Sequence, residues 1–333
     1  MAGSSGYMER EPLTIPKFNN SEVRQLWFTC SGSLLFTDDT ETQNNGPCHF
    51  TTAWLHELDR KPNPLIKHLQ KIKSRRLGLR AESLWEFWLQ NHPDVKLYGK
   101  NIQVYKGKET LGEFDFIYED LRQGQLIHLE TAVKYYLGIP QNNGYCWPGP
   151  NLGDQLQKKA FRLWNHQCKL STTPEGQDTL RKLLNQSSLQ SELSVKTVKR
   201  QWFVTGRLYY PFGAPQKPAH ISFAHPNHYY GHWLTWSEWN QLRSSHDKFN
   251  IAKWIVPERN QWLDPTPEGC FLKSSELANT IEQDWKAISS PHQSRPFHCY
   301  NAARGDGEWY FIVPDQWVTK AMAVTPYIVK DSG

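Results

Sequence analysis

The sequence predicts an α/β fold with a mixed central sheet, whose elements follow one another as helix, strand, strand, strand, helix and strand. Apolar residues recur at helical spacing over residues 77–91, and three strand-like segments with hairpin-length gaps follow within residues 100–136. A second helical pattern at 152–170 and a further strand at 199–212 complete this order. We expect an N-terminal helical segment before this core and a C-terminal α+β extension after it.

The composition is that of a globular protein. The chain has 333 residues, of which 38% are hydrophobic and 21% charged, as in globular proteins with one large core or two smaller ones. No run approaches the roughly 20 apolar residues of a membrane span, and the N-terminus lacks the apolar segment of a secretory signal. We therefore expect no membrane contact and a cytoplasmic location. The net charge of +5 is compatible with a nucleic-acid partner without requiring one.

Three segments organise the chain. Residues 1–20 are small, polar and proline-bearing, so we expect them to be poorly ordered. Residues 21–210 hold the core and its N-terminal helices. Residues 211–333 are rich in Trp and His and form either a small subdomain or an extension of the first sheet.

The N-terminal part of the core region reads as short helices. Residues 21–35 predict a helix with Ser21 as N-cap, and residues 38–47 a polar loop. Two further short helices are expected at 54–59 and 64–73. The basic side chains at the end of this region are either a solvated surface or contacts to phosphate; they are Lys71, Lys73, Arg75 and Arg76.

The helix predicted at residues 77–91 rests on the spacing of its apolar side chains. One stripe indicates the buried face of an amphipathic helix. Its members are Leu77, Ala81, Leu84, Trp85 and Trp88. Glu82 is adjacent to that stripe. Its carboxylate is therefore expected to be either partly buried or an ordinary surface charge.

The two strands at residues 112–119 and 125–136 carry charged side chains where a plain core strand would not. Because strand side chains alternate, Asp115 lies opposite its Phe neighbours, while Glu130 and Lys134 share one face of the following strand. If the two strands pair, an acid from each and a lysine meet on one face. Paired carboxylates are hard ligands for Mg²⁺, and an ammonium group steadies developing negative charge.

The second helix is expected to follow a Gly/Pro-rich loop, with Asn151 as its N-cap. Its apolar stripe packs on the sheet. An adjoining polar stripe of Gln155, Lys158 and Arg162 is available for contacts to a nucleic-acid backbone.

The C-terminal region predicts helices at 232–242 and 274–288 and strands at 252–258 and 308–317. Four histidines gather in one loop-like stretch, namely His220, His225, His228 and His232. Zinc sites usually show compact His/Cys pairs on a helix or hairpin, and this stretch has no cysteine. A packing segment is therefore favoured over a ligand site.

This order of elements, with acids at these points, resembles the PD-(D/E)XK nuclease-like superfamily, whose shared αβββαβ core is of the restriction-endonuclease type. The resemblance implies that Glu82 corresponds to the glutamate of the first helix. It likewise matches Asp115 to the aspartate of the second strand and Glu130 to the acid of the third strand. Lys134 is its candidate for the motif lysine.

The second helix extends the resemblance, and two positions depart from it. Gln155, with Lys158, stands where many members place a glutamine or a basic residue. Ala132 occupies the usual position of the lysine, and Lys134 lies two residues further along the same face, about 6.6 Å away. The proline that usually precedes the aspartate is also missing before Asp115.

The whole chain is similar to a bacterial family, domain-of-unknown-function family 1853. The segments that carry this similarity are GEFDFIY, HLETAVKYYLG, WPGPNLGDQLQKKAFRL, HPNHYYGHW and WYFIVPDQW. The similarity covers most of residues 20–330. It implies a nuclease-like fold and supplies no substrate.

Two hypotheses for function follow. The first is a nuclease that depends on Mg²⁺ or Mn²⁺ and acts on DNA in preference to RNA, with Asp115 and Glu130 holding the metal and Lys134 assisting. Glu82 would be an outer or direct ligand. The second is a nuclease-like scaffold without catalysis that binds nucleic acid or a protein partner, which the displaced lysine favours, because fold alone does not fix activity.

Overall fold

The computed structural model describes most of the chain. Some sequence-based expectations lie outside the described residues: the poorly ordered N-terminus for residues 1–15, the loop at 38–47, and His220. No helix in the described part of the chain is long and apolar enough to cross a membrane. The described residues are 16–36, 52–141, 144–186, 198–214, 224–225, 227–287, 295–303 and 307–323.

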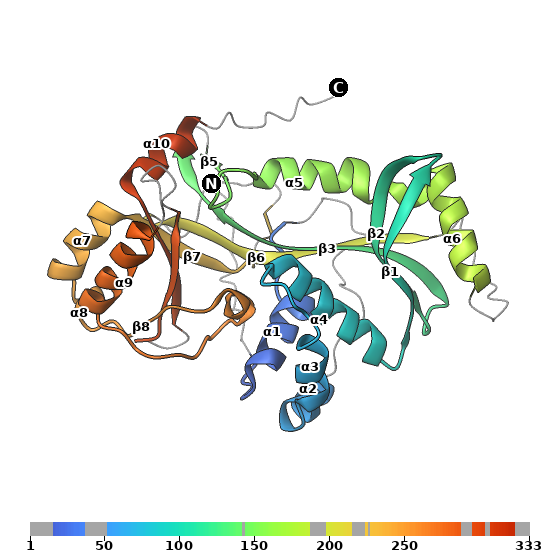
Figure 1. Cartoon of the computed structure of the whole chain (residues 1–333), viewed down its shortest axis with the longest axis horizontal. Coiled ribbons are helices and arrows are strands. Elements are labelled where there is room, and N and C mark those ends of the chain that lie inside the picture. The colour runs from blue at the N-terminus through green and yellow to red at the C-terminus, as the bar shows by residue number, and fades with distance from the viewer. Residues whose placement is uncertain are drawn as a thin grey trace, which may run out of the picture.

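One mixed sheet of eight strands runs through the described residues, in the spatial order β1-β2-β3-β6-β7-β10-β9-β8 (Figure 1). Its centre is parallel, from β3 through β6 and β7 to β10, and both flanks are antiparallel. The α/β class and the mixed sheet are thus confirmed. The strands are β1 (Val95–Lys106), β2 (Glu109–Asp120), β3 (Gln125–Leu137), β6 (Lys199–Pro211), β7 (Tyr230–Thr235), β8 (Trp254–Ile255), β9 (Phe297–Asn301) and β10 (Glu308–Val313), with a separate hairpin of β4 (Ile139–Gln141) and β5 (Gly144–Cys146).

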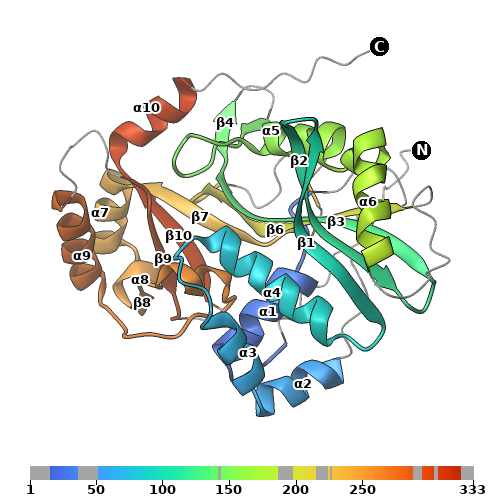
Figure 2. The ribbon, with the colours of Figure 1, turned by 45° about the vertical axis from the view of Figure 1, so that its right-hand side comes forward.

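Helices cover both faces of the sheet. Figures 1 and 2 show α1 and α4 on one side of β3 and β6, and α5 on the other. The C-terminal helices α7 and α9 lie beside β9 and β10 (Figure 2). The helices are α1 (Ser21–Ser31), α2 (Thr52–Arg60), α3 (Asn63–Leu69), α4 (Leu77–Asn91), α5 (Leu156–Arg162), α6 (Pro174–Gln186), α7 (Trp236–Ser245), α8 (Asp247–Asn250), α9 (Ser274–Lys286) and α10 (Asp315–Ala323).

Alternation along β6 places its side chains in two hydrophobic clusters on opposite faces of the sheet. Phe203 packs with Trp85 of α4 on one face, whereas Trp202 and Val204 join the α5 core on the other. Consecutive side chains of a strand point to opposite faces, so a strand that is apolar throughout is typical of a sheet covered on both sides. The burial of Trp85 is the outcome that the periodicity of residues 77–91 predicts.

Three predicted helix boundaries are wrong, each for a local reason. The N-cap of α1 is Asn20, whose side chain accepts the N–H groups of Glu22 and Val23, and the helix ends at Ser31. Residues 230–235 form β7 and not a helix, because they pair with β6 and β10 on either side. The second helix begins at Leu156 and not after Asn151, because Pro148 and Gln155 first form a short β-bridge.

β2 and β6, the two neighbours of β3, pair with it over different lengths. β2 pairs with β3 only from Asp120↔Gln125 to Phe116↔Leu129. β6 follows β3 from Ile127↔Lys199 to Leu137↔Tyr209. Beyond Phe116, β2 continues with β1 alone and rises away from β3 (Figure 1). We call the resulting opening between Asp115 of β2 and the stretch 130–134 of β3 the fork.

Gly206 of β6 lies directly opposite Lys134 and keeps β3 in register there. Its φ of +137° is a conformation that L side chains rarely adopt, and a Cβ would lie 1.7 Å from the Lys134 carbonyl oxygen. Glycine is therefore required where β6 passes the fork.

A buried ion pair joins the N-terminal helices to the C-terminal region. The guanidinium of Arg24 on α1 donates to both carboxylate oxygens of Asp264, from Nε at 2.9 Å and from Nη2 at 3.0 Å. Ser21 donates to the same carboxylate at 2.6 Å, and Asp264 is fully buried. Bidentate geometry and extra hydrogen bonds compensate for the desolvation of both charges.

Replacing Arg24 by Ala is expected to lower the free energy of unfolding by about 3–5 kcal/mol, because it leaves the buried Asp264 carboxylate without its cation. Denaturant unfolding followed by circular dichroism measures the change. Arg60→Ala, at an exposed ion pair on α2, is the control and should leave the midpoint nearly unchanged. Equal midpoints for the two variants would show that the buried pair does not hold these parts together.

Candidate active site

Asp115 and Glu130 come together at the fork, where the ladder between β2 and β3 stops. The Asp115 side chain takes over the missing ladder bond, because its Oδ2 accepts the backbone N–H of Thr131 at 2.8 Å. The Asp115 backbone N–H in turn points at Glu130 Oε1, at 3.5 Å. The two acids therefore sit side by side on neighbouring strands, as the sequence predicts for a paired hairpin.

Glu130 is completely buried and is held from two directions. His128 Nε2 lies 2.9 Å from its Oε1, and Gln167 donates from Nε2 to its Oε2 at 2.6 Å. The other ring nitrogen of His128 lies 3.1 Å from the Ser171 hydroxyl. A buried carboxylate needs such partners, and these fix the direction of its oxygens.

Burial and neighbouring negative charges raise the pKa of the half-buried Asp115. Burial, followed by the Coulomb effect of Glu130, raises the pKa of Asp115 to about 8, and Glu82 adds a smaller contribution in the same direction. The hydrogen bond from Thr131 works against this shift. A cation placed between the carboxylates would relieve the repulsion between them.

Glu82 projects from α4 toward the same region. Burial raises its pKa, and the nearby Glu113 carboxylate raises it further. Its Oε2 lies 3.5 Å from Asn101 Nδ2 of β1, so its side chain leans toward the β1–β2 hairpin. Glu82 is thus close enough to affect Asp115 electrostatically, and no contact joins the two carboxylates directly among the described residues.

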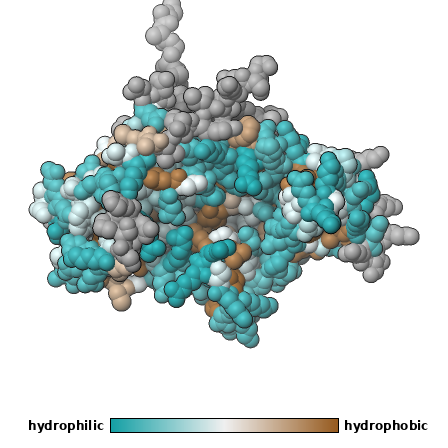
Figure 3. All heavy atoms as spheres, turned by 45° about the horizontal axis from the view of Figure 1, so that its top comes forward, coloured by the Kyte–Doolittle hydropathy of each residue, from teal (hydrophilic) through white to brown (hydrophobic). Residues whose placement is uncertain are grey.

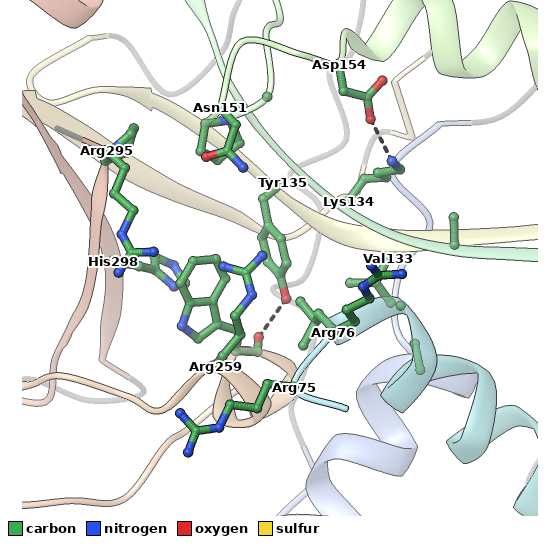
Figure 4. A pocket seen from close by; sticks show the side chains of 18 of the residues that line it. Arg75, Arg76, Val133, Lys134, Tyr135, Asn151, Asp154, Arg259, Arg295 and His298 are labelled. Carbon is green, nitrogen blue, oxygen red and sulfur yellow. Dashed lines mark hydrogen bonds and ion pairs between the residues drawn. The ribbon is translucent and has the colours of Figure 1, made fainter. Parts of the chain in front are cut away.

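Lys134 forms an ion pair with Asp154, not with Asp115 or Glu130. Its Nζ lies 2.6 Å from Asp154 Oδ2, and the Tyr136 hydroxyl donates to the same oxygen at 3.3 Å. Figure 4 shows this pair at one side of the pocket. The loop before α5 therefore holds the lysine that the motif places beside the metal ligands.

Lys159 is the cation that the sequence analysis missed. It lies on α5, and its Nζ donates to Gln167 Oε1 at 2.9 Å, so Gln167 bridges Lys159 and Glu130. Burial lowers the pKa of Lys159, and Lys134 lowers it further, whereas Asp115, Glu130 and Asp154 raise it. These effects place its ammonium among the acids of the fork.

Helical spacing contains a signal for Lys159. It follows Leu156 by three residues and precedes Leu163 by four, and both leucines are buried. Residues at these spacings share a face, so Lys159 borders the face that packs on the sheet. A π-helical turn over Leu163–Gln167 then brings Gln167 to Lys159 and Glu130. The sequence gives no signal for this turn.

The three residues predicted to contact nucleic acid lie in different environments. Gln155 precedes the first turn of α5 and is 2% exposed, whereas Lys158 and Arg162 are exposed on the outer side of that helix. The structure does not bring them together at the fork. Their binding role stays a prediction.

A pocket of about 1020 Å³ lies beside the fork, where residues 131–134 of β3 and Lys159 line it but Asp115 and Glu130 do not. Its walls come from β3, from the loop before α5, from the start of α4 and from the C-terminal region, which contributes Arg259, Trp262 and His298. Figure 4 shows side chains from these segments pointing into one space. The face of the molecule seen in Figure 3 is mostly hydrophilic, with apolar atoms near the hollow at its middle.

The donor set at the fork suits a partly hydrated Mg²⁺ or Mn²⁺. Mg²⁺ in enzymes is typically held by one or two carboxylates, with water and substrate phosphate in its remaining positions. Asp115 and Glu130 would supply those two carboxylates, and Glu130 would do so from a completely buried position in which both its oxygens already have partners. Among the described residues, no group of three or more His, Cys, Asp or Glu side chains is gathered to hold a metal, so a cation here would depend on water and substrate for its other ligands.

The histidines of the C-terminal region make bonds that are local or structural. His228 bonds through one nitrogen to the His225 carbonyl at 2.6 Å and lies 2.8 Å from the Tyr210 hydroxyl through the other. His225 lies 3.2 Å from the Ser33 hydroxyl. These contacts support the packing interpretation of the described part of this segment.

Comparison with known proteins gives one family. A family model described as "Domain of unknown function (DUF1853)" matches residues 24–313. The chain belongs to the DUF1853 family. The DUF1853 match extends from α1 to the end of β10, so it includes the fork and the C-terminal wall of the pocket. No curated protein and no solved structure matches the chain.

Asp115→Asn is expected to change how stability depends on pH in metal-free protein. The folded protein binds the Asp115 proton more tightly than the unfolded chain, so this group makes folding less favourable as pH rises from about 4 to about 8. Above that window its contribution is constant. The variant should therefore gain stability relative to the natural protein as pH rises through this window.

Thermal unfolding in EDTA across this pH range measures the difference between Asp115→Asn and the natural protein. Asp178→Asn, an exposed acid on α6, serves as the control. Parallel pH curves for all three proteins would mean that Asp115 has an ordinary carboxyl pKa.

Proposed function

We propose that this DUF1853 protein is a metal-dependent nuclease that hydrolyses phosphodiester bonds, with DNA preferred over RNA. The observation that carries the proposal is the fork itself, where Asp115 and Glu130 lie on neighbouring strands with Lys159 close by. Lys159 also lines the adjoining pocket, whose wall is rich in cations. The order α4, β1, β2, β3, α5, β6 supports it, once the β4–β5 hairpin and α6 are taken as insertions, because it is the order that the resemblance to PD-(D/E)XK nucleases implies.

In this proposal the carboxylates of Asp115 and Glu130 hold a Mg²⁺ or Mn²⁺ ion. When bound, the metal lowers the pKa of a coordinated water and neutralises charge on the scissile phosphate. His128 and Gln167 keep the Glu130 carboxylate oriented, a role that commonly matters as much as the ligand's presence. Glu82 supports the site electrostatically from α4.

Two lysines are available to stabilise negative charge on the reacting phosphate. Lys134 is the lysine of the motif, but its ammonium is paired with Asp154. Lys159 is half-buried, and its nearby charges include Asp115 and Glu130. An ammonium in such a place contributes most when it is already positioned where charge develops, so we assign this role first to Lys159.

The second candidate function is a scaffold that binds nucleic acid or a protein without cutting. The pairing of Lys134 with Asp154 favours it, because this contact occupies the lysine that the motif would use. The two functions differ in a single measurable property, which is metal-dependent hydrolysis.

Purified protein is expected to cut DNA in Mg²⁺ or Mn²⁺, and Asp115→Ala and Glu130→Ala should abolish cutting. Lys159→Ala should lower the rate constant by about 10²–10³-fold, the usual effect of removing one preorganised donor to developing charge. Lys134→Ala should have the smaller effect of the two lysine variants. Gel assays on linear, circular and single-stranded DNA and on RNA measure these rates.

Controls for the assay are exposed residues near the same elements. Asp178→Ala on α6 matches the acidic variants, and Lys169→Ala matches the lysine variants. Cutting that survives both acidic substitutions would trace to a contaminant and refute the proposed site. Salt-sensitive binding of nucleic acid without any cutting would establish the scaffold instead.

A further inference from the structure

The pocket has an end away from the Lys134–Asp154 pair, and its wall carries arginines from three distant parts of the chain. Arg75 and Arg76 lie just before α4, Arg259 starts a 3₁₀ turn (Arg259–Leu263), and Arg295 precedes β9. All four line the same pocket as Lys134 and Lys159. Figure 4 shows Arg75, Arg259 and Arg295 around one part of the cavity, with Tyr135 between them and the Lys134–Asp154 pair. We call these four residues the arginine cluster.

Cations outnumber anions in the pocket wall. Six lysines and arginines line it against three carboxylates, those of Glu82, Asp154 and Asp284. Asp154 is paired with Lys134, and Asp284 lies 3.5 Å from Arg295. Among the described residues, no carboxylate pairs with Arg75, Arg76 or Arg259. Arg75 and Arg259 are thus left without an anion at this end, and Arg76, beside Val133, is likewise unpaired among the described residues.

The aromatic floor of this end keeps one arginine in place. The Arg259 guanidinium lies over the Trp262 ring, 4.6 Å from its centroid. The Trp262 carbonyl is itself fixed, because it accepts the Tyr135 hydroxyl at 2.8 Å and the Arg207 guanidinium at 2.9 Å. A guanidinium that is stacked in this way still has its planar set of N–H donors available for an anion.

Two further polar features lie in the pocket wall, and the first of them favours an anion. The start of α4, a helix of 15 residues, lines the pocket with no acidic residue in its first turn and no side chain capping its N–H groups. His298 also lines the pocket and is almost fully buried. Its Nε2 lies 2.6 Å from the Tyr209 hydroxyl, while its Nδ1 has no hydrogen-bond partner among the described residues.

We propose that the arginine cluster is a phosphate-binding subsite for a second phosphate of the nucleic-acid strand that is cut at the fork. The proposal rests on the proposed nuclease function. Arginine forks match the geometry of phosphate oxygens, and the helix N-terminus adds favourable dipole interactions. The pocket, at the upper end of the usual range for ligand sites, has room for more than the reacting group.

This subsite would set how the strand lies. A phosphate at the cluster and a scissile phosphate at the carboxylates define two fixed points on one chain, so the substrate enters along β3 in one direction. The C-terminal region, which supplies Arg259 and Arg295, would therefore belong to the substrate-binding machinery. The second phosphate is either a terminal monoester or an internal phosphodiester, since both present the same oxygens.

The test compares strand binding by intact protein carrying Asp115→Asn, in EDTA, so that no cutting occurs. Arg75→Ala and Arg259→Ala are combined in this background and compared with the pair Arg60→Ala and Arg181→Ala, two exposed arginines outside the pocket. Anisotropy of an internally labelled short single-stranded DNA measures affinity at several salt concentrations, with and without a 5′ phosphate.

The cluster variant is expected to bind about tenfold or more weakly, and its slope of log affinity against log salt should be shallower by about 0.7 for the lost phosphate contact. The control pair should match the parent. A loss seen only with the 5′-phosphorylated strand identifies a terminal monoester, and a loss with both strands identifies an internal phosphodiester. Unchanged affinity and slope in the cluster variant would overturn the subsite.

Cleavage kinetics keep this proposal separate from the proposed function. Metal-dependent cutting with an unchanged KM in Arg75→Ala/Arg259→Ala protein would refute the subsite and leave the nuclease standing. Arginine-dependent binding by a protein that never cuts would refute the nuclease and keep the subsite in a binding scaffold.

Discussion

The structure depends on the unequal pairing of β3, which is long with β6 on one side and short with β2 on the other. β3 stays paired with β6 from Ile127 to its end at Leu137, and Gly206 allows β6 to pass Lys134 closely. Its pairing with β2 ends at Leu129. A strand released on one side exposes backbone N–H groups that need acceptors, and the Asp115 carboxylate supplies one of them. The fork is thus both a defect of the sheet and the place where the two acids meet.

The acids at the fork are costly to bury, and their surroundings show how the fold tolerates them. Glu130 is enclosed by His128 and Gln167, so its oxygens are satisfied without solvent. Asp115 has fewer partners and a raised pKa, because burial and Glu130 both disfavour its charge. Strained electrostatics of this kind cluster at functional sites, where a bound cation or substrate relieves them.

The C-terminal region completes the pocket and is held to the N-terminal helices by a buried ion pair. Arg24 and Asp264 connect α1 to the segment that follows Trp262. Trp262 then orders Arg259 at the pocket wall. Residues after 211 also continue the sheet, from β7 to β8. The pocket therefore has a wall that no fragment ending at residue 211 contains.

The sequence by itself indicated that Asp115 and Glu130 lie on neighbouring strands, because a short turn joins the two strand patterns. Helical periodicity determined α4 in the same way. How the two acids meet was decided by the end of the β2–β3 ladder at Phe116↔Leu129. Only the tertiary structure decided which lysine accompanies the acids. That choice depends on where α5 begins and on the pairing of Lys134 with Asp154, which are contacts between separate elements. The sequence marked Arg75 and Arg76 as candidate phosphate contacts, but only the tertiary structure brought Arg259 and Arg295 from the C-terminal region into the same pocket wall.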